Sequence, residues 1–342
     1  MAPRSIILAV CCLSPILAQN ADWRFTHPDA KVFVGIKLRR LRESQVGIAV
    51  RDQMRAQLRD QGISLTPKFP GTELLDQISD VLISSPGRPD GAAENAQPPV
   101  LIRIAGEFDA NKVESFFAQT GAKMQKYRHY RVFRQKGDGD MAASLIDPRT
   151  LLLGDATSLF AALERMEWTD APKNPLLAQA MDMQAQYDLW ALFTVTPSSL
   201  SSAQVPQLAA LDALRGLDLG ISVNDGLSLR LGLNTDSPEE AGKLAAQLKA
   251  LLFVALKQHG APADLAALAN SIRFDVEQNS VRLQAKVGAA ELKKALAEAQ
   301  RRFNEQRAQV AAVHPRPAPE PQGPKVIRIE GLDDGPREIP YK

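Results

Sequence analysis

Residues 216–256 read GLDLGISVNDGLSLRLGLNTDSPEEAGKLAAQLKALLFVAL, and this stretch decides the fold. Apolar residues alternate with small or polar ones on both sides of residues 224–226 (NDG), which predicts two antiparallel strands joined by a tight hairpin turn. Ser237, Pro238 and Glu240 then form a helix start, with a cap, a proline at the first position and a capping box. Apolar residues recur beyond it at the helical period. The stretch therefore predicts strand, turn, strand and helix.

A weaker copy of this pattern lies about a hundred residues earlier. Residues 101–109 (LIRIAGEFD) align without a gap on residues 228–236 (SLRLGLNTD), so that Arg103 corresponds to Arg230 on the face expected to be in water. Asp109 is positioned to cap the next helix. Two copies are too few for a solenoid. We therefore predict an α+β fold of two tandem repeats, each an antiparallel sheet with helices packed on one face.

The chain of 342 residues divides into four segments by composition. Residues 1–18 are expected to be a signal peptide, residues 19–170 the first repeat, and residues 171–313 the second repeat with a long terminal helix. Residues 314–342 are expected to be a Pro-rich tether followed by a short C-terminal segment.

The first segment has the composition of a secretory signal. Arg4 precedes an apolar run, and the run ends at Ala18, where cleavage is expected. The run is short and contains Pro15, so no integral membrane span is predicted in the mature chain. Cys11 and Cys12 both lie in this segment, which leaves the mature chain without thiols. The protein is therefore expected outside the cytoplasm, periplasmic or secreted, and without disulfides or thiolate metal sites.

The charge balance of the mature chain is close to neutral. Removing the signal takes one Arg and no acid, so 41 − 1 = 40 basic residues face 39 acidic ones. This balance gives no electrostatic reason to expect a nucleic acid or an anionic membrane as partner. A basic cluster at Lys37, Arg39, Arg40 and Arg42 is interpreted as a solvated junction between strand and helix, with an anion site at the helix start as the alternative.

Basic and aromatic residues interleave in residues 123–136 (KMQKYRHYRVFRQK). As one strand, this stretch would place Tyr127, His129 and Arg131 on the same side, which makes them candidate ligand-binding residues. The alternative is an ordinary strand whose long side chains cover apolar neighbours. Residues 137–140 (GDGD) form the expected turn and lack the further ligands of a calcium loop, so no metal site is predicted.

The C-terminal segment regains an apolar pattern after the Pro-rich tether. Val326, Ile327 and Ile329 could add a strand to the edge of a sheet, which makes them candidate partner-docking residues. The alternative is a frayed tail.

Catalytic and cofactor motifs are absent from the sequence. The four histidines, His27, His129, His259 and His314, are scattered, and no nucleophile elbow, phosphate loop or dinucleotide fingerprint is present. No catalytic residue and no cofactor is predicted, and an enzyme is the less favoured reading.

Four stretches together carry a resemblance: residues 106–121 (GEFDANKVESFFAQTG), 144–166 (SLIDPRTLLLGDATSLFAALERM), 216–241 and 327–340 (IRIEGLDDGPREIP). With these stretches, most of the mature chain resembles uncharacterised exported bacterial proteins built from two tandem α+β repeats. The resemblance implies a fold and export, and it implies no activity and no site residue.

The sequence as a whole predicts a non-catalytic exported protein that binds a partner or has a structural role in the cell envelope. One alternative is a carrier of an apolar, lipid-like ligand held between sheet and helices. The other is an enzyme with a site that the sequence does not display.

Overall fold

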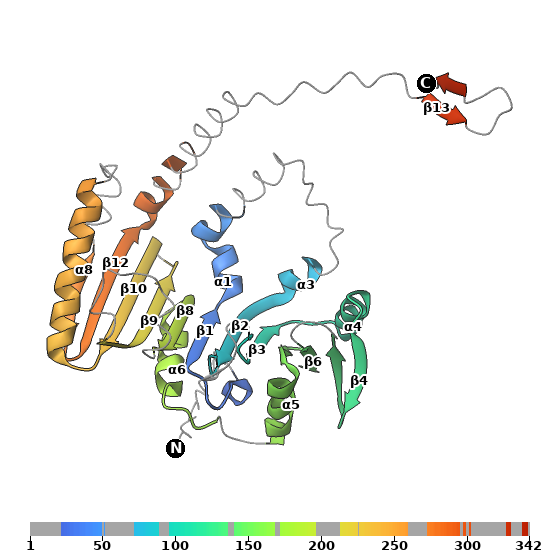
Figure 1. Ribbon diagram of the computed structural model, residues 1–342, viewed down its shortest axis with the longest axis horizontal. Helices are drawn as coiled ribbons and strands as arrows, with labels where there is room; N and C mark the ends of the chain where they lie inside the picture. Colours follow the sequence, from blue (N-terminus) through green and yellow to red (C-terminus); the bar gives the residue numbers. More distant parts are fainter. Residues whose placement is uncertain are drawn as a thin grey trace, which may run out of the picture. The chain divides into compact units, whose positions relative to one another are not determined.

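The computed structural model describes residues 22–49, 51, 72–88, 96–135, 140–167, 172–195, 213–224, 226–258, 272–294, 297–298, 301, 326–329 and 337–340 (Figure 1). The expected signal peptide and most of the Pro-rich tether lie outside these residues. The chain divides into two compact units, residues 1–293 and 294–342, and each is described by itself.

The first unit contains one antiparallel sheet of twelve strands. Its strands are β1 Val32–Ile36, β2 Ile78–Ser85, β3 Leu101–Gly106, β4 Lys123–Tyr127, β5 Tyr130–Arg134, β6 Met141–Asp147, β7 Thr150–Asp155, β8 Leu189–Thr194, β9 Leu214–Ser222, β10 Gly226–Thr235, β11 Arg273–Glu277 and β12 Ser280–Gly288. They lie in the order β11-β12-β10-β9-β8-β1-β2-β3-β7-β6-β5-β4. The halves expected at residues 19–170 and 171–313 meet where β1 pairs with β8, so they share one sheet.

One face of this sheet is apolar from edge to edge. A single transverse row of register partners runs Phe274, Leu283, Leu231, Leu219, Ala191, Val34, Ile83, Ile102, Leu153, Ala143, Phe133 and Met124. Directly opposed residues project to the same side of a sheet. We call this side the apolar face and the other side the opposite face.

Four helices pack on the apolar face. They are α1 Leu38–Glu43, α3 Thr72–Gln77, α4 Ala110–Gln119 and α8 Pro238–Gln258. Leu244 and Ala245 of α8 are buried against Leu233 and Val281 of β10 and β12. At the other end of the sheet, Val113 of α4 lies in a cluster with Leu151 of β7, and α1 and α3 contribute to the same cluster.

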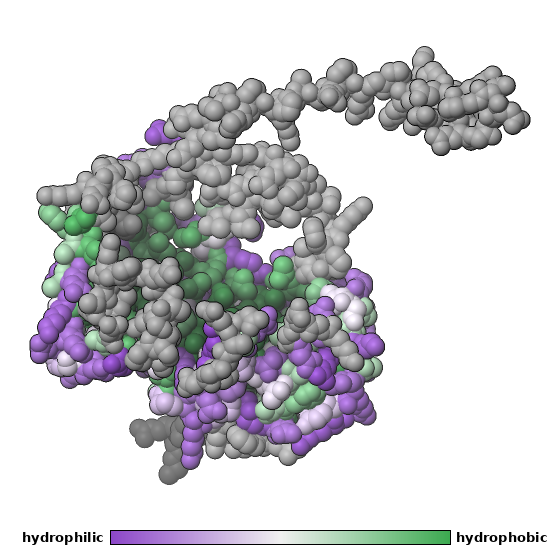
Figure 2. Space-filling model, in the orientation of Figure 1, coloured by the Kyte–Doolittle hydropathy of each residue, from purple (hydrophilic) through white to green (hydrophobic). Residues whose placement is uncertain are grey.

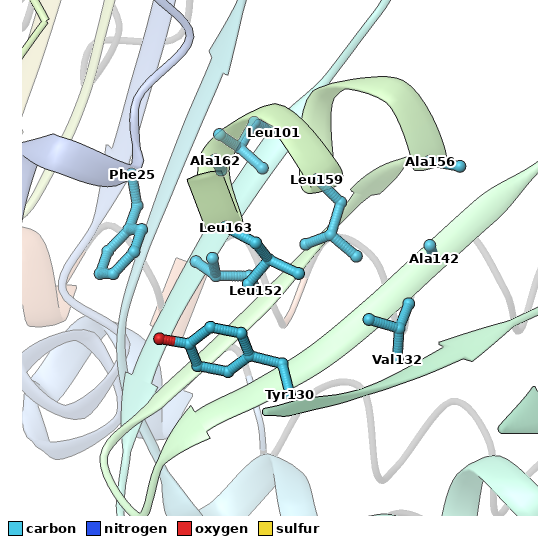
Figure 3. Close-up of a cluster of buried hydrophobic side chains, with 10 residues drawn as sticks. All are labelled: Phe25, Leu101, Tyr130, Val132, Ala142, Leu152, Ala156, Leu159, Ala162 and Leu163. Atoms are coloured by element: carbon cyan, nitrogen blue, oxygen red, sulfur yellow. The ribbon is translucent and has the colours of Figure 1, made fainter. Parts of the chain in front are cut away.

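The opposite face carries helices as well. They are η1 Trp23–Phe25, α5 Ala156–Glu164, η2 Arg165–Glu167 and α6 Leu177–Gln186. Leu159 and Leu163 of α5 pack on Leu101 and Leu152 of the sheet (Figure 3), and Met183 of α6 lies in a second cluster with the central strands. The prediction of helices on one face is therefore wrong for this sheet, because strands such as β3 and β7 carry apolar residues on both sides.

The local prediction for residues 216–256 is confirmed. β9 and β10 form the hairpin, and α8 begins where expected, with the Ser237 Oγ accepting a hydrogen bond from the Glu240 N–H at 3.3 Å. Asp109 caps α4 as predicted, accepting from the backbone N–H groups of Asn111 and Lys112. Helix caps, and turns that contain Asn, Asp or Gly, depend on neighbouring residues, so the sequence indicates them directly.

The second unit contains a two-stranded sheet. β13 Val326–Ile329 pairs with β14 Arg337–Pro340, and Ile327 is opposite Ile339. Residues 289–294 begin the long helix expected over residues 289–313, and most of its remainder lies outside the described residues.

Candidate functional site

The middle of the apolar face is partly open. Its aliphatic and aromatic side chains are half-buried, in contrast to the buried residues under α8. The half-buried set, here called the central face, consists of Val32, Val34, Ile36, Ile83, Leu189, Phe193, Leu219, Ile221 and Leu229. In the view of Figure 2, hydrophobic residues gather across the middle of the body between α8 and α4, with hydrophilic residues around them.

The central face lies on strands whose backbone groups are already paired. β1, β8 and β9 are interior strands, each hydrogen-bonded to a neighbour on both sides. A molecule resting on this face therefore meets hydrocarbon side chains and no free backbone donors or acceptors. Such a surface can bind by excluding water, and it offers no group for acid–base or nucleophilic chemistry.

Helix α8 packs over β10, β11 and β12 on the same side of the sheet. Its first turns are buried in the sheet, whereas Leu251 and Val254 in its C-terminal half are exposed to 40% and 43%.

The opposite face carries a charged cluster on β9 and β10. The carboxyl of Asp218 is almost fully buried and lies 3.6 Å from Arg230 Nε, and neither of these two facing atoms has a hydrogen-bond partner. Burial raises the pKa of Asp218, although Arg230 and Arg282 act in the opposite direction. Tyr187 covers Gly220 beside this pair and contacts the Arg230 guanidinium at 3.5 Å.

Arg103 and Arg230 lie on equivalent sides of the sheet but in different environments. Arg103 is only 7% exposed, and its Nε has no hydrogen-bond partner. Burial lowers the pKa of its guanidinium, while the charges of Asp22, Asp80 and Asp147 raise it. The expectation that Arg103 faces water is wrong, because η1 packs over β3.

The candidate ligand residues Tyr127, His129 and Arg131 are not brought together. The chain turns at Arg128, whose φ is 52°, so β4 and β5 form a hairpin and the prediction of one continuous strand is wrong. The Tyr127 hydroxyl donates to Glu164 at 2.8 Å on the opposite face. Arg131 pairs with Glu114 of α4 on the apolar face, and His129 is exposed in the turn.

The basic cluster after β1 is occupied by structural contacts. Arg42 donates to the carbonyls of Leu75, Asp76 and Ile78 at the end of α3, and so caps that helix. Arg40 lies 3.3 Å from the buried carboxylate of Asp188. Arg39, Arg40 and Arg42 are partly exposed, as the interpretation of a solvated junction predicts, and they also pair with protein groups.

The candidate docking residues Val326, Ile327 and Ile329 all belong to β13, whose strand partner is β14. The structure therefore gives the expected extended conformation, and it does not test docking on another sheet.

Metal-binding groups and membrane-spanning helices are both absent from the described residues. Within them, no group of three or more His, Cys, Asp or Glu side chains could hold a metal ion. No helix in this part of the chain combines the length and apolarity needed to cross a membrane.

The structure defines the class of this molecule as an α+β protein with a large antiparallel sheet. No protein-family model matches the chain, and no curated protein matches it. Among solved structures, it is similar to crystal form IV of TP0453, with 11% identity, a TM-score of 0.49, and coverage of 80% of this chain and 95% of that chain. Crystal form I of TP0453 gives 11% identity, a TM-score of 0.44, and coverage of 81% and 96%. At these scores the likeness carries no inference about function.

Sequence reasoning missed the central face as a site. The alternation of Leu219, Ile221 and Leu229 was a visible signal that one side of the strands is apolar. How far the helices cover the apolar face depends on where segments distant in the sequence pack, and no local pattern indicates this.

Proposed function

We propose that this chain is a non-catalytic exported protein that binds an apolar, lipid-like ligand on the central face. The observation that carries the proposal is the partial exposure of an aliphatic and aromatic surface over interior strands. Apolar surface left in water is unfavourable by roughly 25 cal/mol per Å². A ligand that covers it recovers this free energy.

The chemistry of the central face favours a hydrocarbon chain over a protein as occupant. Protein interfaces contain about one hydrogen bond per 100–200 Å², and the paired strands β1, β8 and β9 offer none from their backbones. A hydrocarbon chain needs none, since each buried CH₂ group contributes about 0.8 kcal/mol. Export supports the proposal, because the signal-like residues 1–18 would deliver the chain to a compartment bounded by membrane lipid.

We propose further that the sheet arose from two tandem repeats. Strand order from the centre runs β1-β2-β3-β7 on one side and β8-β9-β10-β12 on the other. In both halves a helix follows the third strand of this series, α4 after β3 and α8 after β10. The central face then lies along the junction of the two repeats.

Binding of cis-parinaric acid, a fluorescent fatty acid, tests the ligand proposal. Leu229→Gln places an amide on the central face, whereas Ser228→Gln places the same side chain on the opposite face of the same strand. We expect Leu229→Gln to weaken binding by ~10-fold, equivalent to about 1.4 kcal/mol, and Ser228→Gln to leave it unchanged. Thermal unfolding of both variants reports whether the fold is kept.

Three results would count against this proposal. One is no binding by the wild-type protein, and another is equal binding by the two folded variants. The third is the absence of lipid from native mass spectra of protein taken gently from its own envelope, where the proposal predicts bound lipid.

A protein partner in the envelope is the second candidate, and the C-terminal strands favour it. β13 and β14 form a sheet of two strands only, and an isolated two-stranded sheet is marginally stable in water. Addition of a partner strand next to β13, which carries Val326, Ile327 and Ile329, would stabilise it. Removal of residues 314–342 is expected to abolish capture of such a partner, and unchanged capture contradicts this docking role.

A further inference from the structure

A cavity of about 230 Å³, open to solvent on one side, lies on the apolar face beneath the end of α4. It is separate from the central face, since its walls come from α4 and from the strands β5, β6 and β7. Phe116 and Phe117 line it from the helix side, and Phe133, Met141 and Leu153 line it from the sheet.

The cavity exists because a small residue interrupts a row of large ones. Ala143 on β6 stands between Leu153 and Phe133 in the transverse apolar row. Phe117 stacks on Phe133, with ring centroids 5.0 Å apart and an interplanar angle of 12°. The stacked pair holds α4 above the sheet, and the space over Ala143 remains unfilled by side chains.

The walls of the cavity specify the chemistry of a ligand. None of its lining residues is charged, and three of them are phenylalanines, which favours an uncharged aromatic molecule. Two polar side chains also line the cavity. The Thr120 hydroxyl donates to the Phe117 carbonyl at 2.9 Å and keeps its oxygen lone pairs for a donor. The Gln135 side chain is exposed at the wall of the cavity, and its amide can both donate and accept a hydrogen bond.

We propose that this cavity binds a small uncharged aromatic molecule of one or two rings that carries one N–H or O–H group. The size agrees with this class, because an engineered apolar cavity of about 150 Å³ is large enough for benzene. In the complex, the rings lie over Ala143 against Phe116 and Phe117. The polar group of the ligand donates to Gln135 or Thr120. This site goes beyond the proposed function and does not depend on it.

The test uses the full chain and 5-fluoroindole as probe, observed by ¹⁹F NMR. Ala143→Leu fills the cavity, and we expect it to weaken binding by at least ~10-fold. The matched control is Ala191→Leu, which adds the same atoms at another alanine of the same row, between Val34 and Leu219 of the central face. This control is expected to bind 5-fluoroindole as the wild type does.

A second comparison isolates the polar contact. Indene has the shape of indole without its N–H, so Gln135→Ala is expected to weaken indole binding several-fold and to leave indene binding unchanged. If Ala143→Leu does not fold by circular dichroism, Ala122→Leu replaces it, because Ala122 lines the same cavity and is half-buried.

The proposal is overturned if wild-type protein does not bind 5-fluoroindole at millimolar concentration, or if a folded cavity-filling variant binds it as well as wild type. Failure here is distinguishable from failure of the lipid proposal, because cis-parinaric acid binding depends on Leu229 and not on Ala143. If Ala191→Leu alone lost 5-fluoroindole binding, the probe would bind at the central face and not in the cavity. That result would also refute the cavity site.

Discussion

Replacement of Arg103 by methionine is expected to stabilise the protein. Arg103 projects from the opposite face of β3, where its register partners are Leu82 and Leu152 and η1 packs above it. It is 7% exposed, and its Nε has no hydrogen-bond partner. Methionine is unbranched, flexible and of similar volume, so it can occupy most of the same space without a charge.

The sign of the effect follows from two opposing contributions. Burial disfavours the charged guanidinium, while Asp22, Asp80 and Asp147 attract it, and the net result is a lowered pKa for Arg103. Burial therefore outweighs attraction, and the charge destabilises the folded state. Replacing buried charged groups by apolar residues of similar size gains about 1–4 kcal/mol where it succeeds. Asp22 keeps its ion pair with Arg24 in the variant, so we expect a gain of about 1–3 kcal/mol in the free energy of unfolding.

Urea unfolding at pH 7, followed by far-UV circular dichroism, measures this gain directly. The control is Arg131→Met, which removes an exposed arginine paired with Glu114 and is expected to lose less than about 1 kcal/mol. A loss of more than about 1 kcal/mol in folded Arg103→Met would refute the reasoning. It would mean that the three carboxylates compensate the burial of Arg103 in full.

Three other predictions concern stability. Gly35→Ala directs a Cβ into the buried ring of Trp190, so we expect the free energy of unfolding to fall by about 1–3 kcal/mol. Gly242→Ala in α8 meets no atom within 4 Å, so we expect the free energy of unfolding to rise by about 0.5–1 kcal/mol. Urea unfolding of both variants tests the contrast. Asp188→Ala is expected to lose about 2–4 kcal/mol in the same assay, because it leaves the buried N–H of Val223 without its acceptor at 2.9 Å. The pKa of Asp218 is raised above 3.8 by burial, so the folded state holds this proton more tightly, and stability falls as pH rises from 3.8 through the folded-state pKa. Asp218→Asn is therefore expected to gain about 1–2 kcal/mol at pH 7 and nothing near pH 3, and equal effects at the two pH values would contradict this assignment.

Local structure was predictable from the sequence, and the reason is the range of the forces involved. Ser237 and Asp109 cap helices through N–H groups two or three residues away, so the relevant atoms are neighbours in the sequence. The turn at Arg128 and His129 shows the limit. It contains neither Gly nor Asn, and Arg128 takes up a positive φ that these residues usually provide. Pairing of β4 with β5 imposes that conformation, and no residue in the turn itself indicates it.

The environments of Arg103 and Arg230 were not predictable for a different reason. The two residues match in the repeat pattern and lie on the same side of one sheet, as the sequence predicts. What separates them is η1, which comes from residues 23–25 near the start of the chain and packs on β3. Nothing in a strand's own alternation reports which distant segment will lie over it, so the pattern fixes the side of each arginine and not its exposure.

The same limit explains why the candidate sites lie on the apolar face. Twelve strands spaced by about 4.8 Å extend over roughly 50 Å, whereas a packed helix is about 10 Å wide and covers about two strands. The row from Phe274 to Met124 is apolar over the whole width. Four described helices pack on it, and two of these, α1 and α3, have six residues each. With α8 over β10 to β12 and the others around β2, β3 and β7, the strands β1, β8 and β9 retain half-exposed aliphatic side chains. An apolar surface wider than the described helices that pack on it is therefore the physical origin of the proposed ligand site, and covering it with added helix should abolish lipid binding and leave the cavity under α4 unchanged.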